Sequence, residues 1–447
     1  MTTVAEVRLW GSRIGAVALQ GAIDVGADVA TFAYDRAFIA SGIQLAPLMM
    51  PLGSEIFSFP DLPRRSFHGL PGLLADSLPD KYGDALIDAW LATRGRAPEN
   101  FNAVERLCYT GVRGMGALEF APATGPRART AVKIDIDALV KLASEVLTHR
   151  NDLKTSFAGG HRAAALREIL RVGTSAGGAR AKAVIAWNRD TNEVRSGQVE
   201  AGDGFEYWLL KFDGVEGNRD KELADPRGYG VVEYAYAQMA AAAGIDVAEC
   251  RLLEEGGRRH FMTKRFDRLA DGDKLHMQSL AALGHFDFNN PYVNSYEQAL
   301  FCMRRLGLPM AALQEQVRRM VFNVLARNQD DHVKNIAFLM DRAGRWSLSP
   351  AFDITWSYNP AGEWTAQHQM SINGKRDDFA FEDFVACART VSISSARVRS
   401  ICEEVRQAVA RWSCFADEAG VGPNWREVID PSLRLDILIN GAERRAW

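Results

Sequence analysis

The 447-residue sequence lacks any run of apolar residues long enough to cross a lipid bilayer. A membrane-spanning helix needs about 20 mostly apolar residues. The longest apolar stretch here, residues 43–52, is shorter and is interrupted by Gln44, Pro47 and Pro51. The first eleven residues also lack the basic segment and apolar core of a secretory signal. We therefore expect a cytoplasmic protein that does not act at a membrane.

Paired cysteines and an excess of one charge are also missing. The six cysteines are scattered, without a CxxC pair and without the cysteine–histidine spacing of a metal site. In a large chain this pattern predicts reduced thiols. The net charge is only −3, so no overall basic surface indicates binding to nucleic acid. The hydrophobic content of 47% is that of an ordinary folded protein.

Apolar periodicity and turn residues predict a mixture of strands and helices before residue 268 and mostly helices after it. The Pro- and Arg-rich segment Pro122–Arg129 is the best domain boundary. Strands are expected at Val4–Trp10, Ile14–Leu19, Phe32–Tyr34, Gln44–Leu52, Ala183–Trp187, Phe205–Phe212, Val247–Leu253, His260–Thr263, Ile336–Met340 and Trp346–Leu348. Helices are expected at Tyr82–Thr93, Phe101–Tyr109, Ile134–Leu147, Arg162–Arg171, Gly230–Ala243, Tyr296–Leu306, Val317–Arg327 and Ala396–Trp412.

The polar segment Asn328–Asn335 carries the most informative pattern in the chain. Asp330 is followed five residues later by Asn335 and then, after a predicted hairpin, by Asp353. Kinases need a carboxylate for the substrate hydroxyl, then an Asn and a second Asp for Mg²⁺, in this order. The order predicts Asp330 as the catalytic base and Asn335 and Asp353 as magnesium ligands. A solvated acidic turn after a helix is the alternative interpretation.

A second group of residues fits the phosphate side of such a site. Residues 172–182 are small and include three glycines, which lets backbone N–H groups approach an anion. Lys211 ends the next long strand, where kinases place a phosphate-binding lysine. Glu233, in the first turn of the following helix, would pair with Lys211 or lie at the positive helix end. A flexible turn and a solvated strand-end lysine remain the alternatives.

Several motifs resemble the HipA family, the serine/threonine kinase toxins of bacterial type II toxin–antitoxin systems. They are Phe67–Pro71 with Leu78–Asp80, Gly111–Gly116, Ser175–Ala179 with Lys182, Asn328–Asn335 and Ala351–Thr355. The resemblance implies an α+β fold with a small β-rich N-terminal module at 1–125. A bilobal kinase-like domain would follow at 126–447, with an N-lobe at about 126–266 and a mostly helical C-lobe at about 267–447.

The resemblance also implies roles for individual residues. Asp330 would be the catalytic base, and Asn335 and Asp353 the magnesium ligands, as their order already predicts. ATP would be bound by Gly177, Gly178, Ala179, Arg180 and Lys182 of the phosphate loop, by Lys211, by Lys264, Arg265 and Phe266 of the hinge, and by His332, Lys334 and Asn335. Ser175 would be a site of inhibitory self-phosphorylation.

The activity implied by the resemblance is transfer of the ATP γ-phosphoryl group to a protein Ser or Thr hydroxyl, with Mg²⁺ as cofactor. The family's target class is the aminoacyl-tRNA synthetases. Its partner is a small helix-turn-helix antitoxin of the HipB type, through which the complex lies on operator DNA.

Two other functions remain possible from the residues alone. A metal-dependent phosphohydrolase could use Asp330, Asp331 and His332, but it would need further ligands such as His285 or His368. A catalytically weak co-repressor would act only through its antitoxin on DNA.

Overall fold

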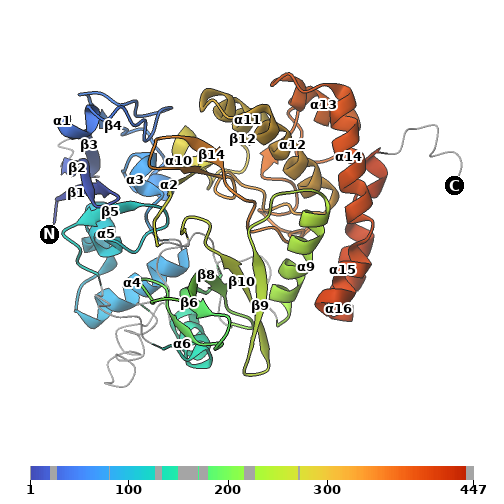
Figure 1. Cartoon of the computed structure of the whole chain (residues 1–447), viewed down its shortest axis with the longest axis horizontal. Helices are drawn as coiled ribbons and strands as arrows, with labels where there is room; N and C mark the ends of the chain where they lie inside the picture. Colours follow the sequence, from blue (N-terminus) through green and yellow to red (C-terminus); the bar gives the residue numbers. More distant parts are fainter. Residues whose placement is uncertain are drawn as a thin grey trace, which may run out of the picture.

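A computed structural model of the chain describes residues 2–20, 28–79, 81–125, 133–148, 170, 180–215, 227–269 and 272–438. Figure 1 shows an N-terminal module at one side, a sheet-containing lobe below the centre and a helical lobe at the other side. The mixture of separate antiparallel sheets and helices confirms the predicted α+β class. The two lobes beside the N-terminal module have a kinase-like arrangement.

The N-terminal module is built on a five-stranded sheet in the order β4-β3-β2-β1-β5, in which every neighbouring pair is antiparallel. The strands are β1 Val4–Leu9, β2 Ser12–Gln20, β3 Val29–Tyr34, β4 Ile56–Ser58 and β5 Leu118–Ala121. The helices are α1 Arg36–Ile39, α2 Arg64–Phe67, α3 Gly72–Ala75, α4 Lys81–Thr93, α5 Ala103–Thr110 and the 3₁₀ turn η1 Pro98–Asn100. The strand after residue 117 therefore returns to pair with the first strand of the chain.

The strand predicted at Gln44–Leu52 is wrong. This segment forms turns, and the strand that pairs with β3 is β4, a few residues later. Pro47 and Pro51 lack the N–H that a ladder requires, which disfavours a strand there. Leu45 and Met50 are instead buried against the module's core.

The N-lobe contains a second antiparallel sheet, in the order β7-β6-β8-β10-β9. Its strands are β6 Lys182–Asn188, β7 Val194–Ser196, β8 Phe205–Lys211, β9 Cys250–Glu255 and β10 Arg258–Lys264. Helices α6 Ile136–Thr148 and α9 Tyr229–Ala242 belong to the same part of the chain. The helix predicted at Arg162–Arg171 falls outside the described residues apart from Leu170.

The C-lobe is mostly helical, as the sequence predicted. Its helices are α10 Leu280–Gly284, α11 Tyr296–Arg305, α12 Met310–Leu325, α13 Phe381–Arg389, α14 Ser395–Val409, α15 Trp412–Ala419 and α16 Pro423–Ile429, with 3₁₀ turns η3 Asp430–Ser432 and η4 Leu435–Leu438. Its strands are β11 His276–Ser279, β13 Ala337–Met340 and β14 Trp346–Leu348 in one sheet, and β12 Asn294–Ser295 with β15 Met370–Ser371 in another. Strand β11 was not predicted.

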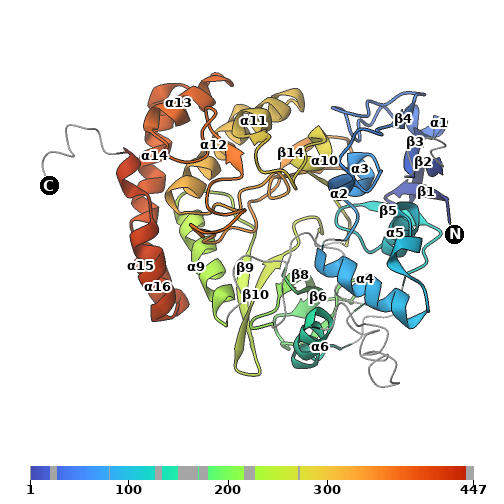
Figure 2. The same cartoon turned by 180° about the vertical axis from the view of Figure 1, so that it is seen from behind.

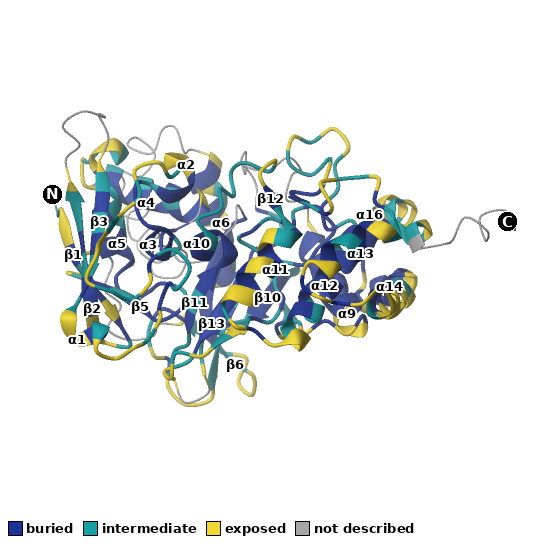
Figure 3. Ribbon diagram, turned by 90° about the horizontal axis from the view of Figure 1, so that it is seen from above, coloured by how far each residue is buried: buried dark blue, intermediate teal, exposed yellow. Residues whose placement is uncertain are grey.

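Helix α12 is the centre of the C-lobe. Its apolar residues at helical spacing, from Val317 to Leu325, are buried in one cluster with α9, α11 and α14. In Figure 3, α12 is mainly buried, whereas α14 carries exposed residues along its outer face. A helix enclosed in this way is a rigid support for the loop that follows it.

The N-terminal module is joined to both lobes through buried contacts. Residues of α4 and α6 share one apolar core with the N-lobe sheet, and Figure 2 shows both helices beside that sheet. At a second contact Asp267 accepts hydrogen bonds from Arg265, Arg268 and the backbone N–H of Gly116. Gly116 has a φ of 73°, and a Cβ there would lie 2.8 Å from the Met277 nitrogen. Only glycine suits that position.

A buried histidine lies at this junction. The Gln278 Nε2 donates to the Leu45 carbonyl of the N-terminal module (2.8 Å) and lies 2.9 Å from the His276 Nε2. An amide nitrogen can only donate, so the His276 Nε2 accepts and the ring is neutral. Burial lowers the pKa of His276 to about 3.

We expect His276 to make the fold sensitive to acid. Its pKa is lower in the folded than in the unfolded chain. Below pH 6.5 the unfolded chain therefore binds a proton at His276 that the folded chain does not bind, and the free energy of unfolding decreases as the pH is lowered. Between pH 7 and pH 5 this one residue should remove about 2 kcal/mol from the free energy of unfolding. Urea unfolding of wild type and His276→Asn at both pH values measures it. An equal loss in both proteins would contradict this assignment.

Candidate active site

The loop after α12 is held by contacts at its beginning. Helix α12 ends at Leu325, and Arg327 has a left-handed backbone conformation with a φ of 57°. The Arg327 Nε donates to the Ser432 carbonyl at 2.8 Å, and the Asn328 Nδ2 donates to the Asn323 Oδ1 at 2.9 Å. The chain therefore turns sharply at the end of the helix and brings Asp330 to the rim of the C-lobe.

Asp330 is the exposed carboxylate of this loop. Its side chain is 45% exposed, and its Oδ1 accepts a 2.6 Å hydrogen bond from the Gln369 Nε2. The His332 Nε2 lies 3.7 Å from the same oxygen. The Asn335 Nδ2 donates to the backbone carbonyl of Asp330 at 2.9 Å. The loop thus folds back so that Asp330, His332 and Asn335 lie together.

Asp331 is buried, in contrast to its neighbour. Its Oδ2 accepts hydrogen bonds from the Tyr296 hydroxyl and the His368 Nδ1, each at 2.8 Å, and its Oδ1 accepts from the Gln369 N–H at 2.8 Å. Sequence reasoning assigned Asp331 and His368 only to the hydrolase alternative, and it missed Tyr296 and Gln369. This carboxylate therefore ties the loop after α12 to the start of α11 and to the segment just before β15.

Lys211 and Glu233 meet at the end of β8. The Lys211 Nζ donates to the Glu233 Oε1, and the Arg180 Nη1 donates to the Glu233 Oε2 at 2.9 Å. Glu233 is almost fully buried, at 1% exposure. Lys182 is the direct neighbour of Lys211 across β6 and β8 and is also buried. One buried glutamate therefore arranges two of the three cations that gather at this edge of the sheet.

Asp353 is the second partner of Lys211, which connects the N-lobe to the C-lobe. Burial alone would lower the pKa of Lys211, but Asp353 and Glu233 outweigh it and raise the pKa. Burial would likewise raise the pKa of Asp353, but the Lys211 ammonium holds it well below its usual range. Asp353 has a φ of 56°, a strained conformation for a residue other than glycine. Such strain is typical of functional sites.

The predicted hinge residues, Lys264 to Phe266, lie at the end of β10. The Lys264 Nζ pairs with Glu206 at 2.5 Å, and the Arg265 guanidinium is bound to Asp267, so both side chains have partners elsewhere. Phe266 instead faces the Asp353 segment, because its ring lies 5.5 Å from that of Phe352. The rings of Phe266 and Phe352 therefore form an aromatic surface between the end of β10 and the Asp353 segment.

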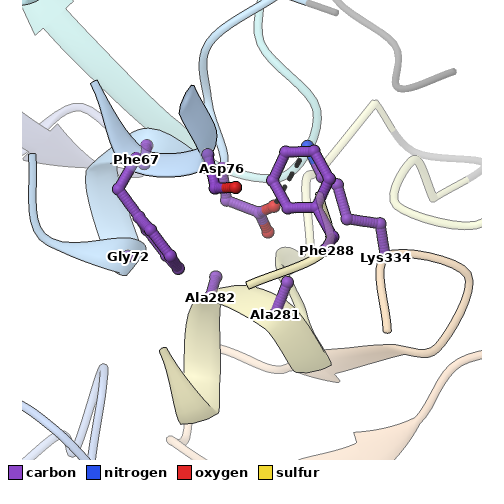
Figure 4. Close-up of a pocket in the computed structure, with 9 residues that line it drawn as sticks. Phe67, Gly72, Asp76, Ala281, Ala282, Phe288 and Lys334 are labelled. Atoms are coloured by element: carbon purple, nitrogen blue, oxygen red, sulfur yellow. Dashed lines mark ion pairs between the residues drawn. The ribbon is translucent and has the colours of Figure 1, made fainter. Parts of the chain in front are cut away.

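Lys334 points toward the N-terminal module. Its Nζ lies 3.9 Å from the Asp76 Oδ1 and 4.7 Å from the centre of the Phe288 ring. Figure 4 shows this ion pair at the edge of a small pocket between α3 and α10. Asp76 also accepts from the backbone N–H and the hydroxyl of Ser279, each at 2.7 Å. The loop after α12 is therefore in direct contact with the N-terminal module.

The residues at the lobe junction fit a magnesium ion. Asn335 and Asp353 line the same pocket, together with Asp331, His332 and Phe352. Because the Asn335 amide nitrogen is turned to the Asp330 carbonyl, its oxygen is left for a cation. A carboxylate and an amide oxygen are ligands that Mg²⁺ accepts.

Some predicted site residues lie outside the described part of the chain, and one histidine of the hydrolase alternative lies away from the site. Ser175, Gly177, Gly178 and Ala179 lie outside the described residues. Among the residues that the structure describes, no group of three or more His, Cys, Asp or Glu side chains could hold a metal ion. His285 bonds to the Gly72 N–H at 3.0 Å, away from Asp331. No described helix is both long and apolar enough to cross a membrane.

Family comparisons cover both parts of the chain. The family model described as the HipA N-terminal domain matches residues 5–121, and the HipA-like C-terminal domain matches residues 174–412. The structure of HipA from Shewanella oneidensis MR-1, in a complex with HipB and operator DNA, aligns with 95% of both chains at a TM-score of 0.65 and 19% identity. That similarity shows a shared fold.

Two curated relatives carry the name "Putative kinase". One, from Haemophilus influenzae, is 27% identical over 135 residues, which are 27% of this chain and 39% of the relative. The other, Y4dM of Sinorhizobium fredii, is 26% identical over 216 residues, which are 45% of this chain and 52% of the relative. The matched segments thus span about half or less of the length of these relatives.

Proposed function

Because the chain belongs to the HipA family, we propose that it is an ATP-dependent kinase that phosphorylates a Ser or Thr hydroxyl of a protein. The observation that carries this proposal is the convergence of Asn335 and Asp353 with the Lys211–Glu233 pair at the junction of two lobes, with Asn335 bonded to the backbone carbonyl of Asp330. A carboxylate for the acceptor, oxygen ligands for a cation and buried lysines for phosphates are the groups that phosphoryl transfer requires.

In the proposed reaction, the acceptor oxygen attacks the γ-phosphorus, and the bond to the β,γ-bridging oxygen breaks to release ADP. Asp330 orients the hydroxyl and accepts its proton. Lys211, Arg180 and Lys182 bind phosphate oxygens at the sheet edge, where Glu233 holds Lys211 and Arg180 in place. Phe266 and Phe352 provide an apolar surface for the adenine, with backbone groups of Lys264 and Arg265 as further hinge contacts.

Asn335 and Asp353 would hold Mg²⁺, which neutralises charge on the phosphates during transfer. Lys211 donates to Asp353 in the structure, so binding of ATP replaces one partner of this lysine by phosphate oxygens. His332, beside Asp330, lines the same pocket as Asn335 and Asp353. Lys334 is adjacent in the loop and would reach them only by leaving Asp76.

We further propose that the kinase is the toxin of a type II system in the cytoplasm. Its target class would be the aminoacyl-tRNA synthetases, and its partner a small HipB-type antitoxin that connects it to operator DNA. The match to a HipA solved with HipB and operator DNA supports such partners. The domain division at residue 125 is supported by family matches that end at 121 and begin again at 174.

An ATP-consumption assay with and without an aminoacyl-tRNA synthetase tests the proposed reaction. We expect phosphate from ATP to appear on Ser or Thr of the acceptor. Release of free phosphate regardless of the acceptor would indicate a hydrolase instead. ATP binding without transfer to any protein would favour the co-repressor.

Lys211→Ala should weaken binding of ATP about 10- to 100-fold, because a charge-assisted hydrogen bond to phosphate is lost. Lys211→Met should not restore it, since the ammonium is required. Glu233 keeps Arg180 as a partner in both variants, so the fold should persist.

Isothermal titration with Mg²⁺ and a non-hydrolysable ATP analogue measures the change in affinity for the nucleotide. Lys141→Ala, on the exposed side of α6, is the control. Unchanged affinity in Lys211→Ala would argue against its role.

Ser175 is the proposed site of self-phosphorylation. A phosphate would add about −1.5 to −2 charges to a loop that must itself hold phosphates, so the modified protein should bind ATP poorly. Mass spectrometry after incubation with Mg²⁺ and ATP should find phosphate on Ser175 in wild type but not in Asp330→Ala. Normal ATP binding and activity in Ser175→Asp would contradict self-inhibition.

A further inference from the structure

The side-chain amide of Gln369 touches the proposed catalytic base directly. Its Nε2 donates to the Asp330 Oδ1 at 2.6 Å, although the two residues are far apart in sequence. Gln369 is only 3% exposed, whereas the Asp330 side chain is 45% exposed. A half-exposed carboxylate, that of Asp330, is thus hydrogen-bonded to the buried side chain of Gln369.

Gln369 is held on both sides of its backbone. Its N–H donates to the Asp331 Oδ1 at 2.8 Å, and its carbonyl accepts from the Arg376 Nη1. The preceding residue, His368, donates from Nδ1 to the Asp331 Oδ2 at 2.8 Å. The following residue, Met370, pairs with Asn294 where β15 meets β12. These contacts leave the Gln369 amide little freedom to move away from Asp330.

The amide is also incompletely satisfied. Within the described part of the chain, the Gln369 Oε1 is buried and has no hydrogen-bond partner. A buried polar atom without a partner lowers stability, so such groups in folded proteins call for a reason. Here the orientation that leaves the oxygen without a donor is the one that turns the Nε2 toward Asp330.

We propose that Gln369 is a positioning residue that fixes the rotamer of Asp330, an inference that rests on the proposed kinase function. By binding Oδ1, the amide restricts rotation of the carboxylate and leaves Oδ2 to meet the acceptor hydroxyl. A general base works only within hydrogen-bond reach of its proton, and displacements near 1 Å can reduce rates about 100-fold. Gln369 therefore acts on the chemical step and not on nucleotide binding.

The test compares Gln369→Met, which keeps the volume but removes the hydrogen bond, with Gln369→Glu, which places a second carboxylate against Asp330. We expect kcat to fall about 10- to 100-fold in Gln369→Met and further in Gln369→Glu. The KM for ATP and the Kd for a non-hydrolysable ATP analogue should stay within twofold of wild type. Gln314→Met is the matched control, because Gln314 on α12 bonds only to Arg397 in the contacts described, at 2.9 Å. Its kcat should equal that of wild type.

A role limited to stability would instead change nucleotide affinity and the unfolding temperature together. Crystal structures of wild type and Gln369→Met give a second readout that does not depend on activity. The Asp330 carboxylate should have one orientation in wild type and a different or mixed one in the variant. An unchanged carboxylate, or a kcat within twofold of wild type, would overturn the proposal. If wild type binds ATP but transfers no phosphate, the kinase function fails, while the two crystal structures still decide whether Gln369 positions Asp330.

Discussion

Asp330→Ala is expected to lower the rate of phosphoryl transfer about 10²- to 10⁴-fold, because no other carboxylate of the loop can replace the base. Asp331, its neighbour, is buried and turned toward Tyr296 and His368. The Asp330 side chain is 45% exposed, so its loss should lower the free energy of unfolding by only about 1 kcal/mol, the cost of leaving the buried Gln369 Nε2 without its acceptor. Initial rates with labelled ATP and a protein acceptor measure the first effect, and urea unfolding measures the second.

The same variant separates kinase activity from toxicity. In a host without the antitoxin, wild type should inhibit growth and Asp330→Ala should not. Asp203→Ala is the matched control, because Asp203 is an exposed carboxylate in the loop before β8. It should inhibit growth like wild type. If Asp330→Ala inhibits growth equally well, the toxic effect does not come from phosphorylation.

Asp331→Ala is expected to lower the free energy of unfolding by about 3–5 kcal/mol, the cost of removing one member of a buried charged network. The substitution leaves the Tyr296 hydroxyl, the His368 Nδ1 and the Gln369 N–H without their acceptor. Each is buried where water cannot readily replace the carboxylate. Urea unfolding at pH 7 measures the loss.

Asp331→Asn separates the effect of losing hydrogen bonds from the effect of losing side-chain volume, because asparagine has nearly the same size as aspartate. Its remaining oxygen can still accept from the Gln369 N–H, so we expect an intermediate loss of stability. Activity should fall in Asp331→Ala as well, because Gln369 and with it Asp330 would no longer be held. A free energy of unfolding within 1 kcal/mol of wild type for Asp331→Ala would contradict a structural role for this residue.

The elements that follow a regular pattern were predictable from the sequence. Helix α12 is one example, because its apolar residues from Val317 to Leu325 recur at helical spacing and are buried. The strand that ends at Lys211 is another, since β8 spans Phe205–Lys211. The order Asp330, Asn335 and Asp353 was also readable, because kinase chemistry requires these groups in that order along the chain.

Elements that depend on distant partners were not predictable in the same way. Strand β11 is formed by His276–Ser279, which gains its pairing from β13, some sixty residues later. The segment at Gln44–Leu52 is apolar like a strand, but its prolines and its packing under the N-terminal sheet make it a set of turns. Local propensity is a weak guide where pairing and packing come from elsewhere in the fold.

The sequence by itself determined the family resemblance, the two-part organisation and the chemical types of the site, since these depend on residue identity and order. Only the tertiary structure decided which of two adjacent carboxylates is exposed. Asp331 meets Tyr296 and His368, so it is buried and holds the loop, and Asp330 is left half-exposed with Gln369 on one oxygen. Lys334 likewise turned to Asp76 of the N-terminal module. Hydrogen bonds between distant residues set these orientations, and their geometry exists only once the chain is folded.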